Sequence, residues 1–330
     1  MSDILVIGGG IIGLLTAREL VQNGASVTLV EMGETGRESS WAGGGILSPL
    51  YPWRYPDAVT ALAGWSQQVY PELCAELYDE TRIDPELTIN GLLILDADER
   101  GPAAAWAQRH GGEVQVIDGP RIHEIEPALA LRPAEALLMP TVAQVRNPRL
   151  VKAIRRALAG RIQLREQEEV LEILTAGGRT QGVRTSKGMI EADQIVVCTG
   201  AWTARLLDQI GRQPTIEPVR GQMILFLARP GQINQITLYR DRYVIPRRDG
   251  RVLIGSTLEH EGFVKATTDE ARASLTQSAT ELFPLLKGVL IEQHWSGLRP
   301  GSPSGVPYIG PCPGTAGLYV NAGHYTNGVG

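Results

Sequence analysis

Residues 3–31 have the sequence DILVIGGGIIGLLTARELVQNGASVTLVE, and this stretch decides the fold. Four apolar residues precede Gly8, and an apolar helical face with Ile12, Leu15 and Leu20 follows the glycines. Gly24 then separates this face from VTLVE, which has the composition of a second strand. The two kinds of apolar spacing predict a strand, a glycine turn, a helix and a strand, which together form one βαβ unit.

The glycine turn has the spacing of a dinucleotide-binding loop. Gly8, Gly10 and Gly13 form G-x-G-x-x-G directly after the strand. The first glycine permits the tight turn, the second lets a pyrophosphate approach the backbone, and the third lets the helix pack on the strand. Glu31 closes the second strand, where a carboxylate can accept hydrogen bonds from an adenosine ribose. This acid disfavours NADP and leaves both NAD and FAD open. The alternative is a structural glycine turn beside a surface glutamate.

Two later stretches extend the expected nucleotide site. GRESSWAGGGILSP (36–49) places two serines and three consecutive glycines after the ribose strand, in what we predict to be a loop over residues 33–45. The backbone N–H groups and hydroxyls of this loop could hydrogen-bond a further part of the same ligand. The alternative interpretation is a flexible loop without a binding role. IVVCTGAWT (195–203) ends a buried-type strand in a Thr-Gly-Ala turn, which resembles the second nucleotide-facing strand of flavoproteins.

Composition excludes several classes of function. The chain has 330 residues, 43% of them hydrophobic, so it can bury a large core and we expect two domains. Its 31 basic and 36 acidic residues are spread along the chain without a basic stripe, which argues against a nucleic-acid partner. No apolar run reaches the roughly 18 residues of a spanning helix, so we expect no membrane partner. The three distant cysteines indicate a reducing, cytoplasmic compartment and no bound metal.

The rest of the chain alternates between helical and strand-like patterns. We expect a helix from residue 57 to about residue 79, with Trp65 on its apolar face. A second helix is expected in NPRLVKAIRRALAG (147–160), where Asn147 can cap, Pro148 can occupy the first turn and Gly160 ends the helix. Short strands separated by glycine turns are predicted for 169–198. A second β-rich stretch runs from 222 to 257, with a hairpin turn at RRDGR. A capped helix follows at TTDEARASLTQSATELFP.

Several motifs together resemble the D-amino-acid-oxidase-like flavoproteins, and most closely their glycine oxidase (ThiO) branch. They include VIGGGIIG, SSWAGGGILSP, VVCTGAW, PVRGQM and RYVIPRRDGRVLIGST, and they span nearly the whole chain. WSGLRPGSPSGVPYIGP followed by NAGHYTNG is specific to this group. The resemblance implies an α/β fold in which a doubly wound FAD-binding (GR2-type Rossmann) domain is interleaved with an antiparallel-sheet substrate domain. The FAD-binding domain is expected at 1–85, 145–215 and 295–330, and the substrate domain at 86–144 and 216–294.

The resemblance also implies an activity. Members bind FAD noncovalently and oxidise the C–N bond of glycine, sarcosine and small D-amino acids. The imino acid hydrolyses to the oxo acid and ammonia, molecular oxygen becomes hydrogen peroxide, and the imine serves thiamine biosynthesis. Rival hypotheses are a D-amino acid dehydrogenase, a sarcosine-oxidase-like enzyme, and, from another class, a noncatalytic dinucleotide-binding module. The subunit count stays open, a homo-oligomer included.

The expected site residues follow from the same resemblance. Arg299 binds the substrate carboxylate with its guanidinium fork, and Tyr243 hydrogen-bonds the same carboxylate. Hydride transfer needs alignment more than acid–base help, so no side chain is assigned as catalytic. The cofactor-binding residues are Gly8, Gly10, Ile11, Ile12, Gly13, Glu31, Met32, Ser39, Ser40, Gly43, Gly44, Gly45, Val170, Thr199, Gly200, Trp202, Arg299, His324, Tyr325, Thr326, Asn327, Gly328, Val329 and Gly330.

The last loop departs from the family pattern. The family carries an arginine there as a second carboxylate contact, and Thr326 stands in its place. The preferred amine is therefore open. The family also continues into an apolar helix after this loop, so we expect the natural chain to extend past Gly330.

Overall fold

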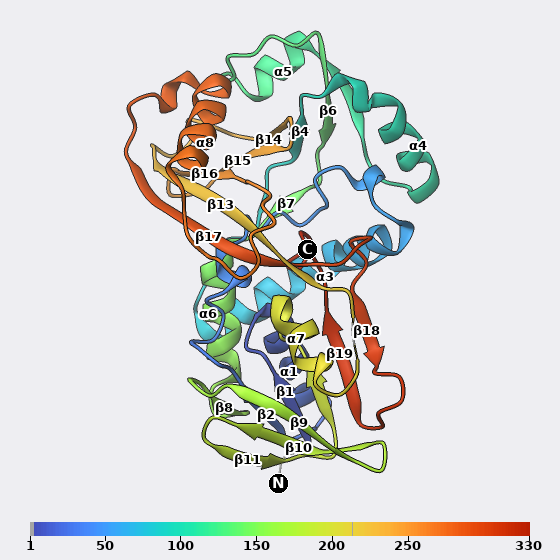
Figure 1. The fold of residues 1–330 in the computed structure, drawn as a ribbon. Helices are drawn as coiled ribbons and strands as arrows, with labels where there is room; N and C mark the ends of the chain where they lie inside the picture. Colours follow the sequence, from blue (N-terminus) through green and yellow to red (C-terminus); the bar gives the residue numbers. More distant parts are fainter. Residues whose placement is uncertain (1–2, 213) are drawn as a thin grey trace.

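The computed structural model describes residues 3–212 and 214–330, and a six-stranded sheet organises its lower half (Figure 1). Its strand order is β18-β19-β12-β1-β2-β8, and every neighbouring pair is parallel except β18 with β19. The predicted βαβ unit is confirmed as β1, α1 and β2 at the centre of this sheet. The strands and this helix are β1 (Ile4–Ile7), α1 (Ile11–Gln22), β2 (Val27–Val30), β8 (Gln163–Arg165), β12 (Ile195–Val197), β18 (Tyr308–Pro311) and β19 (Leu318–Ala322).

Both faces of the six-stranded sheet are covered, which explains its nearly continuous apolar strands. Helices α1, α3 and α6 form one core on the first face, and the β9–β11 meander with α7 forms a second core on the other. The predicted doubly wound arrangement is therefore confirmed. These elements are α3 (Asp57–Thr81), α6 (Asn147–Leu158), β9 (Val170–Ala176), β10 (Arg179–Thr185), β11 (Gly188–Glu191), η3 (Gly200–Trp202) and α7 (Thr203–Asp208).

An eight-stranded sheet organises the upper half (Figure 1), in the order β17-β13-β16-β15-β14-β4-β6-β5. Its neighbouring strands are antiparallel except β14 with β4. Helices α8 and α5 pack on one face, and α4 packs on the other. The strands are β4 (Leu92–Ile94), β5 (Gln115–Asp118), β6 (Glu135–Met139), β13 (Glu217–Leu227), β14 (Ile236–Tyr239), β15 (Arg242–Pro246), β16 (Arg251–Gly255) and β17 (Ile291–Gly301). The remaining elements are α2 (Ser39–Ala42), η1 (Pro52–Arg54), β3 (Thr88–Ile89), η2 (Ala97–Glu99), α4 (Arg100–His110), α5 (Gly119–Ile125), β7 (Ala143–Gln144), α8 (Asp269–Leu282) and η4 (Pro284–Leu286).

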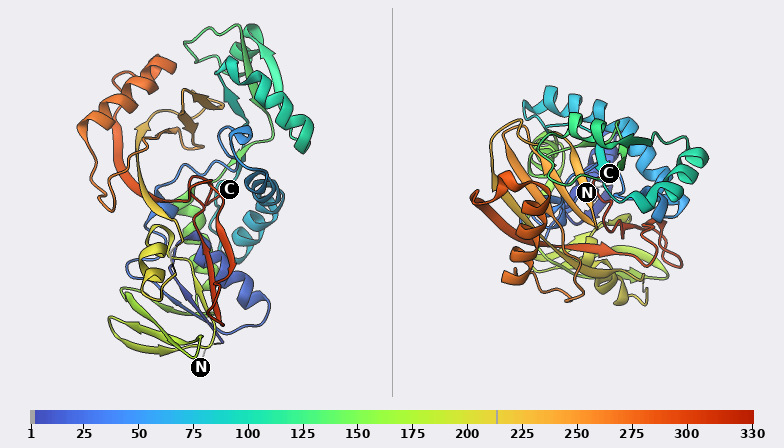
Figure 2. Two further views of the ribbon diagram at one scale, coloured as in Figure 1. Left: turned by 45° about the vertical axis from the view of Figure 1, so that its right-hand side comes forward. Right: turned by 90° about the horizontal axis from the view of Figure 1, so that it is seen from above.

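The two sheets meet along the long strands β13 and β17. Figures 1 and 2 show the C-terminal loop between the sheets, far from the N terminus at the lower end. The N–H of Tyr325 donates to the carbonyl of Pro300 at 3.0 Å, so the last loop is tied to the end of β17. The last residues of the chain therefore lie at the junction of the two sheets.

Three local predictions were wrong. Trp65 lies 66% exposed, because α3 buries the face that carries Val59, Tyr70 and Leu77 instead. Asn147 is the first residue of α6, and its side chain makes no cap hydrogen bond. The predicted loop at 33–45 contains one helical turn, α2, whose serines are used for packing contacts described below.

The described residues contain no helix that is both long and apolar enough to cross a membrane. Cys74, Cys198 and Cys312 are buried, and none of them forms a disulfide within the described residues.

Candidate active site

A cavity of about 1170 Å³ lies at the junction of the two sheets. Its wall combines the glycine turn after β1, the segment around α2, the end of β12, strands β13, β15 and β17, and the last loop. Pockets for one small ligand usually have about 300–1,000 Å³, so this cavity can hold a ligand larger than a single small molecule. Most of the residues expected to contact cofactor or substrate line it. Gly13 and Gly330 do not.

The glycine turn can be built only from glycines. Gly8 has φ +104°, and a Cβ on it would lie 2.5 Å from the carbonyl oxygen of Cys198. A Cβ on Gly13 would lie 1.9 Å from the carbonyl oxygen of Gly8, so this glycine brings α1 against the strand end. Within the described chain, the N–H groups of Ile12 and Gly13 have no hydrogen-bond acceptor. The helix therefore begins with open donors, as an anion site requires.

Glu31 closes the nucleotide end of the cavity. One carboxylate oxygen accepts the N–H of Gly9 at 2.7 Å, and the other accepts the N–H of Gly33 at 2.9 Å. Burial raises the pKa of the Glu31 carboxyl, although both backbone donors act in the opposite direction. Each carboxylate oxygen can accept more than one hydrogen bond, so a ribose hydroxyl can still bind here.

The serines of α2 contribute differently from what the sequence suggested. The Ser40 hydroxyl accepts the N–H of Ile11 at 2.8 Å, so it satisfies the first helical donor of α1. Ser40 is buried, whereas Ser39 is half-buried, and both line the cavity. One turn of helix thus packs against the dinucleotide-binding turn and stiffens it.

The three glycines after α2 pass through a narrow gap. A Cβ on Gly44 would lie 2.9 Å from Ile245 and 3.2 Å from the ring of Tyr243. Gly45 has φ +76°, and a Cβ on it would lie 2.2 Å from the carbonyl oxygen of Val145. The chain can run between β15 and Val145 only because these positions have no side chain.

Arg299 offers a positive charge to the cavity from β17. Its Nη2 donates to the Ser256 hydroxyl at 2.6 Å, and its Nη1 donates to the Thr257 carbonyl at 3.2 Å. No carboxylate within residues 3–212 and 214–330 forms an ion pair with it. A half-buried guanidinium without an acidic partner favours an anionic ligand, and the two oxygens of a carboxylate can accept two parallel hydrogen bonds from it.

Tyr243 lies on the same face of the eight-stranded sheet as Arg299. It is 8% exposed, and its hydroxyl lies 3.9 Å from the Met223 sulfur, a weak acceptor. Strand pairing places Tyr243 beside Gly255 and Gly255 beside Met223, and Arg299 lies on β17, the strand next to that of Met223. The Arg299 guanidinium lies over Gly221 and the Tyr243 ring lies over Gly255, positions where a Cβ would come within 2.4 Å of the side chain above it.

The last loop closes the cavity from the junction side. The Thr326 hydroxyl lies 3.0 Å from the Tyr55 hydroxyl, and the Tyr70 hydroxyl donates to the Val329 carbonyl. Burial lowers the pKa of His324 to about 4, so the imidazole is neutral near pH 7. The side-chain amide nitrogen of Asn327 is buried and has no partner in the part of the chain that the structure describes. Such a donor fits a ligand acceptor.

Sequence reasoning missed several residues of this site. Ser256 and Thr257 hold the Arg299 guanidinium; they end the RYVIPRRDGRVLIGST motif, but nothing in that motif assigned them a role. Tyr55, which contacts Thr326, lies outside every motif quoted above. Arg247 donates to the Gly44 carbonyl at 2.7 Å from outside the cavity wall. The RRDGR turn predicted the hairpin on which it lies, yet nothing in that turn distinguished Arg247 from Arg248 beside it.

Known proteins resemble this chain over its whole length. The family model described as FAD dependent oxidoreductase (DAO) matches residues 3–330. A glycine oxidase of Pseudomonas aeruginosa is 50% identical over 332 residues, covering 100% of this chain and 91% of that protein. A glycine oxidase of Pseudomonas putida is 48% identical over 330 residues, covering 99% and 90%. The crystal structure of glycine oxidase from Geobacillus kaustophilus matches with a TM-score of 0.94 at 30% identity, covering 99% of this chain and 90% of that one.

Proposed function

This chain belongs to the FAD dependent oxidoreductase (DAO) family, and from that premise we propose that it oxidises the C–N bond of glycine and related small amines. The products are an imino acid, which hydrolyses to the oxo acid and ammonia, and hydrogen peroxide from molecular oxygen. Sarcosine and small D-amino acids complete the substrate class. We include thiamine biosynthesis as the use of the imine and the cytoplasm as its compartment.

The cavity has features that fit noncovalently bound FAD. Among the described residues, the N–H groups of Ile12 and Gly13 in the first turn of α1 lack acceptors, and Asn327 presents an unpartnered side-chain amide nitrogen. Glu31 lies at the end where an adenosine ribose would bind. When bound, FAD supplies the acceptor for two electrons. We propose that the glycine turn, α2 with Gly43–Gly45, Val170, the Thr199–Trp202 turn and the last loop hold it.

Arg299 is the observation that carries the proposal. Its guanidinium lies on the cavity wall without an acidic partner, and the Tyr243 hydroxyl lies on the same face of the sheet with only a sulfur beside it. Both groups can therefore hydrogen-bond the carboxylate of an amino acid. Anchoring the carboxylate at one end fixes the position of the Cα–H bond, and alignment of this kind contributes much of the rate in such a step.

We also propose the interleaved division in which residues 1–85, 145–215 and 295–330 bind FAD and residues 86–144 and 216–294 form the substrate domain. In support, β1, β2, β8 and β12 come from the first set, while β4, β6, β14, β15 and β16 come from the second. Arg299 and Tyr243 would then belong to different sets, although both lie on one face of the eight-stranded sheet.

Peroxide release from the purified yellow protein tests the proposal. We expect turnover with glycine, sarcosine or D-alanine, and we expect acid precipitation to release FAD into solution. Arg299→Ala should keep the flavin spectrum and lower kcat/KM at least about a hundredfold, because a charged hydrogen-bonded pair is lost. Yellow protein that reduces its flavin with these amines but releases no peroxide would indicate a dehydrogenase. No flavin reduction by any of them would overturn the proposal.

A further inference from the structure

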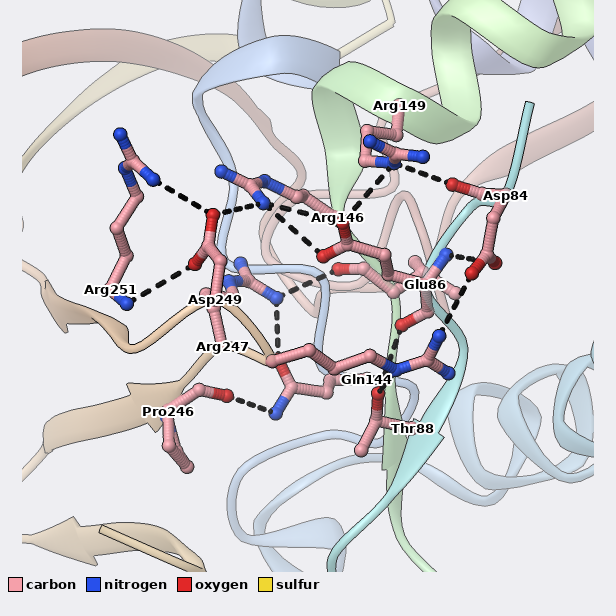
Figure 3. A network of polar contacts seen from close by, with 12 residues as sticks. Asp84, Glu86, Thr88, Gln144, Arg146, Arg149, Pro246, Arg247, Asp249 and Arg251 are labelled. Atoms are coloured by element: carbon pink, nitrogen blue, oxygen red, sulfur yellow. Dashed lines mark hydrogen bonds and ion pairs between the residues drawn. The ribbon is translucent and has the colours of Figure 1, made fainter. Parts of the chain in front are cut away.

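Arg247 connects the hairpin that carries Tyr243 with the glycine segment of the cavity (Figure 3). Its Nη1 donates to the Gln144 amide oxygen at 2.5 Å and to the Val145 carbonyl at 3.0 Å. Its Nη2 donates to the Gly44 carbonyl at 2.7 Å. A guanidinium can reach three acceptors at once because its donors form a rigid, planar fork.

Arg247 has no carboxylate partner of its own among the described residues. Burial lowers its pKa to about 10, the positive charge of Arg146 acts in the same direction, and Glu86 and Asp249 act against it. The group is therefore still protonated near pH 7. A half-buried cation whose hydrogen bonds all go to neutral oxygens is unusual, because charges withdrawn from water are normally paired.

The nearby acids are occupied by other arginines (Figure 3). Arg146 binds Asp249 at 2.8 Å and Glu86 at 3.3 Å. Arg251 also binds Asp249, at 2.9 Å. These ion pairs connect the start of α6 with the β15–β16 hairpin and hold the backbone around Arg247 on both sides. Arg247 is thus left to hydrogen-bond the carbonyl groups.

The contact with Gly44 sets the direction of a peptide that lines the cavity. A trans peptide is planar, so the N–H of Gly45 points away from the carbonyl that Arg247 holds. Gly44 and Gly45 both line the cavity, and neither N–H has an acceptor within residues 3–212 and 214–330. Enclosed N–H groups rarely remain without an acceptor, so a bound ligand would supply it.

We propose that Arg247 is a positioning residue for the cofactor: by holding the Gly44 carbonyl, it aligns the Gly45 N–H of the same peptide with FAD and keeps this peptide in place beside Tyr243. The inference rests on FAD occupying the cavity and is independent of which amine is oxidised. Arg247 itself touches neither cofactor nor substrate. Its effect passes through one peptide of the glycine segment.

Variants at Arg247 and at its neighbour test the inference. Arg248 lies on the same turn and donates to Thr88, Asp84 and Leu87, away from the cavity, so Arg248→Gln is a matched control. Arg247→Gln removes the fork, and Arg247→Lys keeps the charge but cannot reach three acceptors. FAD affinity is measured by titrating each apoprotein, alongside the flavin absorption spectrum, kcat, KM and the melting temperature.

We expect Arg247→Gln to weaken FAD binding at least about tenfold and to shift the flavin spectrum. It should also lower kcat, while KM changes less than about twofold. Arg247→Lys should give values between those of Arg247→Gln and the wild type. Arg248→Gln should match the wild type in FAD affinity, flavin spectrum, kcat and KM. A lower melting temperature in Arg247→Gln with unchanged FAD affinity and spectrum would mean a purely structural role and overturn the inference. Should Arg247→Gln not fold, wild-type values in Arg247→Lys would overturn it. A wild type that binds no FAD would instead contradict the proposed function.

Discussion

At the nucleotide end of the cavity, the shaping residues lie within one βαβ unit, whereas at the substrate end they come from strands whose order in the sheet differs from their order in the chain. Gly8, Gly13 and Glu31 act on backbone groups of the same unit or its immediate neighbours. Arg299 instead depends on Ser256 and Thr257, which lie in the segment directly after β16.

This difference explains why a sequence motif predicts the nucleotide end, whereas no short motif predicts how the substrate end is assembled. A backbone-based site needs particular residues at particular spacings, since only glycine tolerates the close approaches at Gly8 and Gly13. A site assembled across strands needs only that the correct side chains share a face once the sheet forms. Changes at the two ends should therefore fail in different ways.

The largest expected effect is at the nucleotide end. Gly13→Ala puts a Cβ where the Gly8 carbonyl lies, 1.9 Å away, so helix and strand must separate. We expect a loss of at least about 3 kcal/mol in the free energy of unfolding, together with loss of FAD, measured by thermal unfolding and flavin content. Gly64→Ala in α3, where nothing lies within 4 Å of the new Cβ, should be neutral or stabilising. A fully flavinated Gly13→Ala protein would break the comparison.

An intermediate effect is expected at the substrate end. Tyr243→Phe removes a hydroxyl whose nearest partner is the Met223 sulfur at 3.9 Å, so stability and FAD affinity should stay the same. The kcat/KM for glycine should fall about tenfold or more, because the substrate carboxylate loses a hydrogen bond. Tyr78→Phe, which removes a hydroxyl from an exposed side chain of α3, serves as the control and should leave kcat/KM unchanged. Weaker FAD binding in Tyr243→Phe would show that the two ends are not separate.

The smallest expected effect concerns the loop between the ends. The folded-state pKa of His324 is lowered by burial to about 4, below its ordinary value of 6.5. The unfolded chain therefore binds a proton first as the pH falls, and stability is lost between about pH 6.5 and pH 4. We expect His324 to account for about 1 kcal/mol of the loss by pH 5, after allowing for its partial exposure. Urea unfolding at pH 7 and pH 5 should show a smaller difference in His324→Asn. An equal difference in both proteins would contradict this assignment.

Sequence patterns predicted the elements better than the roles of their polar residues. The βαβ unit, the β9–β11 meander and the β15–β16 hairpin are confirmed because each is encoded by periodicity and turn residues. Asn147 does not cap α6: its enclosed amide lies beside Gly43 and Gly45 instead. Tertiary packing overrode the local preference of this side chain for a helix end.

The sequence by itself predicted the nucleotide end, since Gly13 meets the Gly8 carbonyl and Glu31 meets the Gly9 and Gly33 N–H groups within one short stretch of chain, although the close approach of Gly8 to Cys198 also needs β12. It also determined the class of protein, because the glycine turn and the run around Arg299 carry the family resemblance. Only the tertiary structure decided that Arg299 has no acidic partner among the described residues, that Thr326 meets Tyr55, and that Arg247 rather than Arg248 holds the glycine segment. These outcomes depend on the order of strands in a sheet, which no local pattern encodes.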